Sequence, residues 1–432
     1  MASAIGIPNV AHQPISKSEQ AIWLRLLMQL FVVAVVFLNG ADFLGKTGED
    51  EFVVHWQVLL RLAVCGCCGV IGLFRLFPHT YQDFLTWPGI LISLYVIWNG
   101  VSVVFSQEQM YSLAAWVSMF CVVLFIPAAM RVLGGYRLLL TVGFATTLFL
   151  VGSWFAFKYY PEVGIWKEKI TQSDVVERMG GLGHPNELGV YSMYTVLVVS
   201  ALLQSGRLNW KIAVPIIVLG FVTLVGCFSR TSMIATMVGL PFVFRKSLLK
   251  PGNVFGVIFA IAAFALIAFF VIGSGRIDWM IEDALLKITK SGSTEELTSA
   301  TGRTEIWAFG ISKIIESPIV GYGYCTSRFV MVDYSYHCHN MILNSAIYSG
   351  IFTGVVVLIH TGYLGICAFL RSDYAIDGMA MAMLAAGLVE SLIAAPAPAI
   401  NIFMYMMLIF WRQMHLTLDR PNARATLQIQ SP

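Results

Sequence analysis

Residues 138–157 read LLLTVGFATTLFLVGSWFAF and contain no charged side chain. A membrane-spanning helix needs about 20 mostly apolar residues, because at 1.5 Å per residue that length crosses a hydrocarbon core roughly 30 Å thick. Arg137 precedes the stretch and Lys158 follows it. The pattern therefore predicts a transmembrane helix over 138–158.

The composition indicates that the whole chain follows this pattern. Of its 432 residues, 58% are hydrophobic and only 12% are charged, and the mean hydropathy is +0.76. Soluble domains are nearer half apolar and a quarter charged, so much of this surface is expected to meet lipid. The net charge is only +3, and no basic cluster interleaved with aromatic residues is present, which excludes nucleic acid as a partner.

Twelve apolar stretches of spanning length follow one another without an internal repeat, the first being taken as an uncleaved span. They lie near 22–40, 54–77, 84–105, 111–130, 138–158, 187–205, 211–228, 231–248, 253–273, 341–369, 376–396 and 398–414. We expect an all-α, polytopic integral membrane protein of about twelve transmembrane helices, with residues 1–432 forming a single membrane domain.

The loops between these spans alternate in charge. Basic side chains occupy every second loop, namely Arg75, Arg131, Arg137, Arg207, Lys211, Arg245, Lys246, Lys250 and Arg371. The intervening short loops are acidic or neutral, as in Glu49–Glu51 and Gln107–Gln109. Since Lys and Arg concentrate on the cytoplasmic side, the pattern predicts that both termini are cytoplasmic.

Two outer segments are long, at about 159–186 and about 274–340. Connections of that length are usually functional or disordered. The second contains apolar positions at helical spacing over 277–288, and a second helix is expected from about Thr304 to Glu316, where Ser317-Pro318 ends it. The sequence predicts a helical extracytoplasmic loop with two amphipathic helices between spans nine and ten.

Three arginines on the outer side break the charge rule. Arg230 lies in a tight turn between two spans, Arg178 lies in a glycine-containing segment before the sixth span, and Arg303 begins the second loop helix. An arginine that snorkels to headgroups or lies on the surface is the bland reading of each. Charges near the membrane interior usually line a bundle interior or a cavity, so for Arg230 a functional role is favoured. A helix N-terminus favours anions, so Arg303 makes most sense if it shares an anion with the free N–H groups.

The stretch His337-Cys338-His339 has three readings. A metal site would need Asp333 or Cys325 as further ligands, but the spacing matches no standard zinc pattern, so we expect no metal. Cys325 and Cys338 share one oxidising compartment and could form a disulfide. A histidine whose ordinary pKa is near 6.5 is also suited to general-base catalysis at neutral pH.

Arg61 and Glu390 are charged residues inside predicted spans, both toward the outer half. Ionisable groups within a membrane usually pair or line a polar cavity, so the two either pair with each other or extend an outer cavity. Arginines bind phosphate through bidentate hydrogen bonds. An outward cluster of arginines beside a histidine base therefore indicates chemistry on a lipid-linked pyrophosphate.

Short motifs over about 175–370 resemble those of the O-antigen ligase and polysaccharide polymerase superfamily. The motifs are Gly302-Arg303 with Trp307, Pro318 with Gly321-Tyr322-Gly323, His339-Asn340, the pair Gly350 and Gly354, Ser229-Arg230, and Arg178…Gly181…Pro185-Asn186. The N-terminal five spans share little with the family beyond hydrophobicity.

The resemblance implies a glycosyltransferase at the periplasmic face of the bacterial inner membrane. Its donor would be an undecaprenyl-pyrophosphate-linked glycan and its acceptor another glycan or a lipid A core, with inversion at the anomeric carbon and no metal or cofactor. The residue roles it implies are pyrophosphate contacts from Arg178, Arg230 and Arg303, proton abstraction by His339, second-choice bases or orienters in Asp333 and His337, and a cover over the donor from Tyr322 and Tyr324.

Other functions stay open. Ligase and polymerase are not distinguished by these residues, and transfer to a protein serine is a third enzymatic option that the short C-terminal tail disfavours. A transporter or flippase of lipid-linked oligosaccharide is the rival from another class. Transporters place their sites near the midplane of repeated halves, whereas the candidate charges here lie at the outer interface.

Overall fold

The structure is a computed structural model that describes most of the chain. The described residues are 17–41, 56–76, 80–169, 175–248, 303–332, 334–370, 373–393 and 400–418. The predicted ninth span, the predicted helix over 277–288 and the candidate residue Asp333 lie outside these residues.

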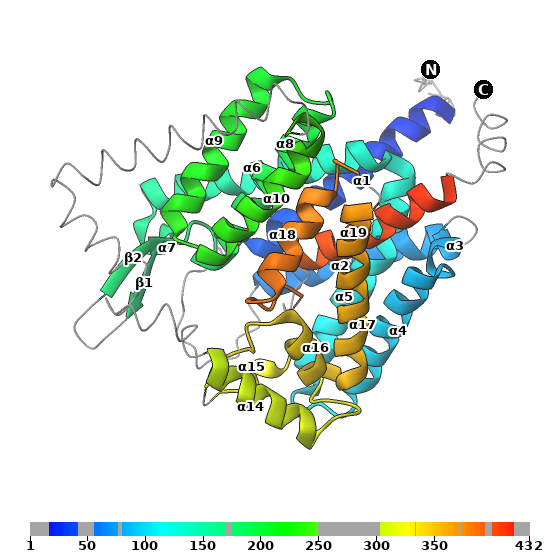
Figure 1. The fold of residues 1–432 in the computed structure, drawn as a ribbon. Helices are drawn as coiled ribbons and strands as arrows, with labels where there is room; N and C mark the ends of the chain where they lie inside the picture. Colours follow the sequence, from blue (N-terminus) through cyan, green and yellow to red (C-terminus); the bar gives the residue numbers. More distant parts are fainter. Residues whose placement is uncertain are drawn as a thin grey trace, which may run out of the picture.

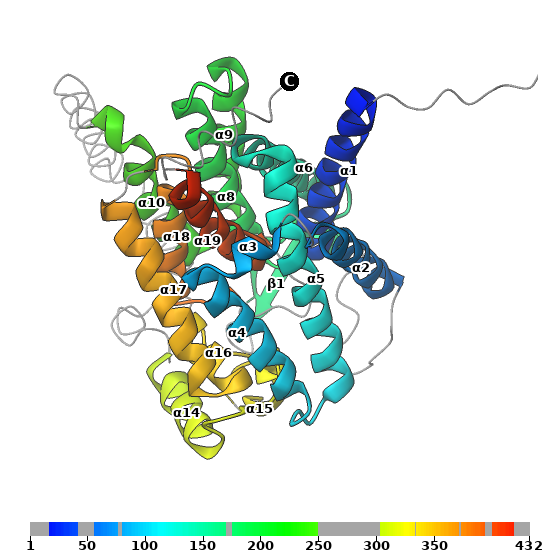
Figure 2. The ribbon, with the colours of Figure 1, turned by 90° about the vertical axis from the view of Figure 1, so that its right-hand side faces the viewer.

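The first half of the chain forms long helices at the predicted positions (Figures 1 and 2). They are α1 (Lys17–Gly40), α2 (Trp56–Arg75), α4 (Trp87–Val103), α5 (Gln109–Leu133), α6 (Gly135–Tyr159), α8 (Pro185–Gln204), α9 (Trp210–Cys227) and α10 (Arg230–Leu248), with the short α3 (Tyr81–Phe84) before α4. Within the described ranges, seven helices are long and apolar enough to cross a membrane: α1, α2, α5, α6, α8, α9 and α17 (Ile351–Leu370). The prediction of an all-α polytopic membrane protein is confirmed.

Two predicted spans differ from the structure. The stretch 341–369 is two helices, α16 (Met341–Ser349) and α17, because the chain breaks at Gly350 with φ +83°. The stretch 376–396 begins as α18 (Asp377–Gly387) but ends after 11 residues, and turns follow to residue 393. Hydropathy detected both apolar stretches but not where their helices end. The last predicted span is α19 (Ile400–Leu418).

The outer segment at 159–186 contains a hairpin that the sequence did not predict. The short α7 (Pro161–Gly164) leads into β1 (Ile165–Lys169), which pairs antiparallel with β2 (Val175–Met179). Trp166 lies opposite Arg178 in this pairing. The hairpin thereby fixes Arg178 just before the start of α8.

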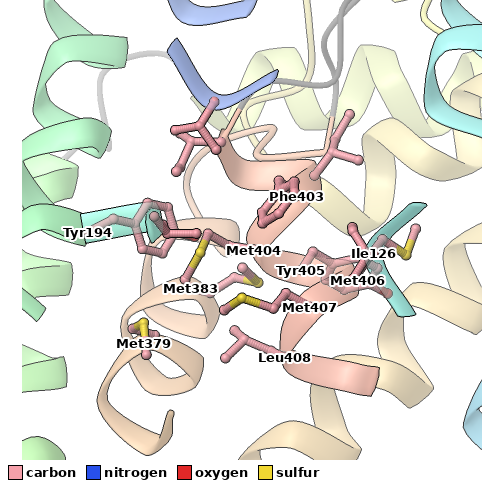
Figure 3. Packing of buried hydrophobic residues seen from close by; sticks show 14 of the residues in the cluster. Ile126, Tyr194, Met379, Met383, Phe403, Met404, Tyr405, Met406, Met407 and Leu408 are labelled. Carbon is pink, nitrogen blue, oxygen red and sulfur yellow. The ribbon is translucent and has the colours of Figure 1, made fainter. Parts of the chain in front are cut away.

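The core of the bundle is built around α19. Its residues from Ile402 to Trp411 are all buried, as expected of a helix that is apolar on every side. Figure 3 shows Met404 and Met407 of α19 on the side of Met379 and Met383 of α18, and Met406 on the other side of α19 beside Ile126 of α5. Unbranched thioethers fill irregular gaps between helices, so this methionine layer fits α19 against its neighbours.

Helices α14 (Arg303–Glu316), α15 (Ser327–Val330) and α16 and the loops between them form a cap at one end of the bundle. Figure 1 shows α14 and α15 next to α16 at that end. A small apolar cluster holds the cap together, in which Ile314, Met331, Cys338 and Ile347 are buried. The second predicted loop helix, from about Thr304 to Glu316, matches α14.

Candidate active site

His339 and Glu390 form the centre of the site. The Nδ1 atom of His339 lies 3.1 Å from Oε2 of Glu390, and its Nε2 atom lies 3.4 Å from the Ser335 hydroxyl. The side chains of His339 and Glu390 are 25% and 16% exposed, so solvent reaches both. Glu390 lies in the turns that follow α18, and it meets a loop 51 residues away in the sequence.

The second oxygen of the Glu390 carboxylate joins two more segments. Its Oε1 atom lies 3.7 Å from the Arg303 guanidinium at the start of α14. The Thr231 hydroxyl, at the start of α10, donates to the same oxygen at 3.5 Å. One carboxylate therefore connects α10, α14, the histidine loop and the end of α18.

The electrostatics of the site keep Glu390 ionised. Burial by itself raises the pKa of the carboxyl, but the hydrogen bond with His339 and the nearby charge of Arg303 together hold its pKa below the ordinary value. A carboxylate only accepts hydrogen bonds. The contact with Glu390 therefore requires the His339 proton on Nδ1 and leaves the Nε2 lone pair free to take a proton.

His337 packs against His339 but stays neutral. The two ring centroids are 4.2 Å apart. Burial lowers the pKa of His337 to about 4, and the neighbouring His339 and His184 act in the same direction against the opposing effect of Glu390.

The backbone at 337–340 aims alternate side chains in different directions. His339 has φ +49°, a left-handed conformation that histidine tolerates better than most residues and that often occurs at functional sites. Asn340 then caps α16, accepting from the N–H groups of Ile342 and Leu343, and its Nδ2 donates to the Leu388 carbonyl at 3.0 Å. These contacts hold the loop against the turns that carry Glu390.

Cys338 points away from the histidines into the cap. Its sulfur lies 3.4 Å from the Met331 sulfur, and its carbonyl accepts from the Trp307 indole at 2.9 Å. Cys338 and Cys325 are both free thiols, so the possible disulfide between them does not form.

The glycine motif of the cap has a structural role. The N–H groups of Tyr322 and Gly323 donate to the carbonyls of Ile347 and Tyr348 at 3.0 and 2.8 Å. These carbonyls belong to the last turn of α16, which the break at Gly350 leaves without helical partners. Gly321 has φ +63°, and a Cβ there would lie 2.5 Å from the Ile347 carbonyl oxygen. Only glycine allows this approach.

Arg178 is buried and holds the turn that precedes Arg230. It donates to the Cys227 carbonyl from Nε at 3.0 Å and from Nη2 at 2.8 Å, and also to the Phe228 carbonyl and the Asn186 side chain. These groups end α9 and begin α8. Arg178 thereby holds the end of α9 against the start of α8.

Arg230 and Arg303 are the first residues of α10 and α14, and both are partly buried. Helix N-termini carry a partial positive charge, so an arginine at each makes the region around Glu390 strongly attractive to anions. The structure brings these two predicted arginines to the same part of the molecule as His339.

A comparison with protein families gives this arrangement a family context. Residues 215–358 match the family model described as O-antigen ligase. The chain carries an O-antigen ligase domain. No curated protein matches the chain. Arg230, Arg303, His337 and His339 lie within the matched residues, whereas Arg178 and Glu390 lie outside them.

The O-antigen ligase domain identifies the broad class of the protein. It is a membrane glycan-processing enzyme of the ligase or polymerase type, in a multi-pass bacterial membrane protein. The family implies lipid-linked glycan and acceptor substrates. The resemblance drawn from the short motifs is confirmed.

For three residues the structure shows surroundings other than those expected from the sequence, namely Tyr322, Tyr324 and Arg61. The Tyr322 hydroxyl donates to Glu316, the last residue of α14, about 20 Å along the helix from Arg303 at 1.5 Å per residue. Tyr324 is fully buried and does not cover a donor. Arg61 donates to the Leu38 carbonyl at the end of α1 and does not pair with Glu390.

His337, His339 and Glu390 could also hold a metal ion. One ligand atom from each lies within 4.8 Å of the others. The Arg303 guanidinium beside Glu390 repels a cation, however, and the hydrogen bond to Glu390 already occupies Nδ1 of His339. The donor set therefore fits a proton-transfer pair better than a cation site.

The sequence reasoning missed Thr231 and Ser335 and left Glu390 undecided. Glu390 carried a signal, since an acidic residue in a predicted span usually has a function. Its partner depends on how α18 packs, and no local pattern encodes that. The hydroxyls of Thr231 and Ser335 resemble many others in the sequence and carried no signal.

Proposed function

We propose that the protein transfers a glycan from an undecaprenyl-pyrophosphate donor to a sugar hydroxyl at the periplasmic face of the inner membrane. The observation that carries this proposal is the 3.1 Å contact between His339 and an ionised Glu390, beside two helix N-termini that each begin with an arginine. This arrangement combines a base with an anion-binding region.

The base acts on the acceptor. The Nε2 atom of His339 takes the proton of the acceptor hydroxyl as its oxygen attacks the anomeric carbon of the donor. Glu390 orients the ring and stabilises the imidazolium that forms, as a carboxylate does behind other catalytic histidines. Ser335, at 3.4 Å from Nε2, lies where it can orient the incoming hydroxyl.

The arginines act on the leaving group. The bond between the anomeric carbon and the phosphate oxygen breaks, its electron pair passes to that oxygen, and undecaprenyl pyrophosphate departs. Arg230, Arg303 and the first N–H groups of α10 and α14 stabilise the negative charge that develops there. A single displacement of this kind inverts the anomeric centre and uses no metal.

Two further residues keep the site in place. Arg178 fixes the turn that carries Arg230 through the Cys227 carbonyl. His337 stays neutral because burial lowers its pKa to about 4, so it adds no charge that would compete for Glu390.

The sidedness of the site follows from the loop charges. The cap, the hairpin and the His339 loop belong to the segments that the positive-inside rule assigns to the outside. A flippase is less consistent with this placement, because transport sites lie near the bilayer midplane. The acceptor is another glycan if the protein is a polymerase and a lipid A core if it is a ligase.

The test uses the purified full-length protein with a lipid-pyrophosphate-linked glycan and both kinds of acceptor. Release of undecaprenyl pyrophosphate is measured for the wild type, His339→Ala, Arg230→Ala and the control Lys211→Gln, whose side chain lies at the other end of α9 from Arg230. We expect release by the wild type and the control only.

Three outcomes contradict the proposal: no release by the wild type, full activity in both site variants, or donor that crosses the bilayer without being consumed. The product distinguishes the acceptors, because elongated lipid-linked glycan indicates a polymerase and glycan on the lipid A core indicates a ligase.

A further inference from the structure

A basic cavity lies at the opposite end of the bundle from the His339–Glu390 site. It measures about 450 Å³, and its charged lining residues are Arg25, Arg137 and Arg207. Helix α8 extends from the site to the cavity. His184 and Asn186 at its start lie by the His339–Glu390 site, and Leu202 near its end lines the cavity. At 1.5 Å per residue the 20 residues of α8 extend about 30 Å, the thickness of the hydrocarbon core.

The three arginines come from separate parts of the chain. Arg25 lies on α1, Arg137 in the first turn of α6, and Arg207 in the turn between α8 and α9. The described residues that line the cavity include no carboxylate. Across the described ranges, none of the three forms an ion pair, although Arg207 lies over the Tyr136 ring at 5.0 Å.

Two other arginines at this end of the bundle are neutralised by carboxylates. Arg131 forms a bidentate ion pair with Asp83, in which Nε and Nη2 donate to the two carboxylate oxygens at 2.8 and 2.7 Å. Arg412 pairs with the buried Asp377. A basic residue that served only to orient the chain in the membrane would need no cavity, so the three unneutralised arginines around one cavity indicate an anionic ligand.

The shape and position of the cavity select the kind of anion. Leu133, Leu140 and Leu202 form its apolar wall, and the cavity lies at the depth where lipid headgroups meet the hydrocarbon core. Basic pockets between transmembrane helices bind anionic lipid headgroups, and guanidinium groups match phosphate oxygens through paired hydrogen bonds. The backbone adds to the positive potential in the cavity. Helix α6 begins at Gly135 without a side-chain cap, so its first N–H groups can also attract an anion.

We propose that this cavity binds the phosphodiester headgroup of an anionic phospholipid at the membrane face opposite the His339–Glu390 site. The three guanidinium groups hold the phosphate, and the leucines contact the glycerol and the first methylenes of the acyl chains. The site is separate from glycan transfer and does not depend on that activity.

The test measures retention of phosphatidylglycerol and phosphatidylethanolamine by the full-length protein, using native mass spectrometry. We expect the wild type to retain phosphatidylglycerol preferentially. Arg137→Gln combined with Arg207→Gln should weaken that retention about 25-fold, because each arginine near an anionic headgroup contributes about a factor of five. The control Lys211→Gln removes a charge outside the cavity and should retain the lipid.

Inorganic phosphate distinguishes the two sources of phosphate. Millimolar phosphate should leave the lipid bound, and full displacement would overturn the proposal in favour of a soluble ligand. Equal retention of both lipids by the wild type would also overturn it, as would unchanged retention by a double variant whose lipid-free melting temperature matches the wild type. If the double variant does not fold, Arg25→Gln replaces it. Its retention of phosphatidylglycerol should fall about fivefold, and unchanged retention would overturn the proposal.

Discussion

His339 directs its Nδ1 atom at Oε2 of Glu390 from 3.1 Å, although one residue precedes α16 and the other follows α18. This contact sets the tautomer of the histidine and thereby decides which ring nitrogen can act as a base.

Replacing Glu390 by glutamine should remove this control. The amide can donate to Nδ1 and so move the proton to Nε2, which then has no lone pair for the acceptor hydroxyl. We expect kcat to fall by about 10²–10⁴-fold, the usual contribution of a general base. Steady-state release of undecaprenyl pyrophosphate measures the change. Glu316→Gln is the matched control, since Glu316 pairs with Lys313 at the far end of α14, and equal activity of the two variants would contradict the role of Glu390.

Replacing Arg303 by lysine should weaken the transition state while keeping the charge. A charge-assisted hydrogen bond is worth about 1.5–3 kcal/mol, and lysine lacks the planar guanidinium. We expect kcat/KM to fall about tenfold to a hundredfold, and further in Arg303→Gln. Lys313→Gln, on the same helix and outside the site, should behave as the wild type. A fully active Arg303→Lys would show that the guanidinium geometry does not matter.

The low pKa of His337 predicts acid sensitivity. Burial holds the pKa at about 4 in the folded protein, against about 6.5 when unfolded. Above pH 6.5 both states are neutral, and stability is unaffected. As the pH falls from 6.5 to 4, only the unfolded state takes up the proton, so the folded state loses at most about 3 kcal/mol.

Thermal melts of the protein in detergent between pH 7 and pH 4 measure this effect. His337→Asn, which cannot titrate, should lose less stability over that window than the wild type. The lowered pKa of Glu390 acts in the same direction but below its ordinary value of 4.5, so it does not obscure the difference near pH 5.5. Parallel curves would mean that His337 is not buried as a neutral ring.

Gly321→Ala should destabilise the cap. The residue has φ +63°, and the new Cβ would lie 2.5 Å from the Ile347 carbonyl oxygen. The left-handed conformation alone costs about 1–2 kcal/mol for an L-residue, so we expect a lower melting temperature. Gly362→Ala is the matched control and should raise the melting temperature. Its Cβ meets nothing within 4 Å, and alanine favours a helix interior by about 1 kcal/mol. Equal melting temperatures for the two variants would contradict the docking of the cap.

Metal chelation should leave glycan transfer unchanged. The Arg303 guanidinium lies 3.7 Å from Glu390 and disfavours a cation among His337, His339 and Glu390. Activity is measured before and after exhaustive treatment with a chelator. Loss of activity that a divalent cation restores would assign these three residues to a metal.

The sequence by itself determined the bundle and most of its helices. Hydropathy is a property of consecutive residues, so runs such as 138–157 identify α6 without knowledge of its neighbours. Local exceptions to the charge pattern likewise identified Arg230, Arg303 and His339.

The tertiary structure alone decided how these residues are arranged. The break at Gly350 depends on backbone contacts with the loop at 318–323, and the pairing of His339 with Glu390 depends on where α18 ends. Arg178 was expected on the pyrophosphate but donates to the carbonyls at the end of α9. A side chain's partner is set by the packing of distant helices, because the free energy of a polar contact depends on which groups the fold brings within hydrogen-bonding distance.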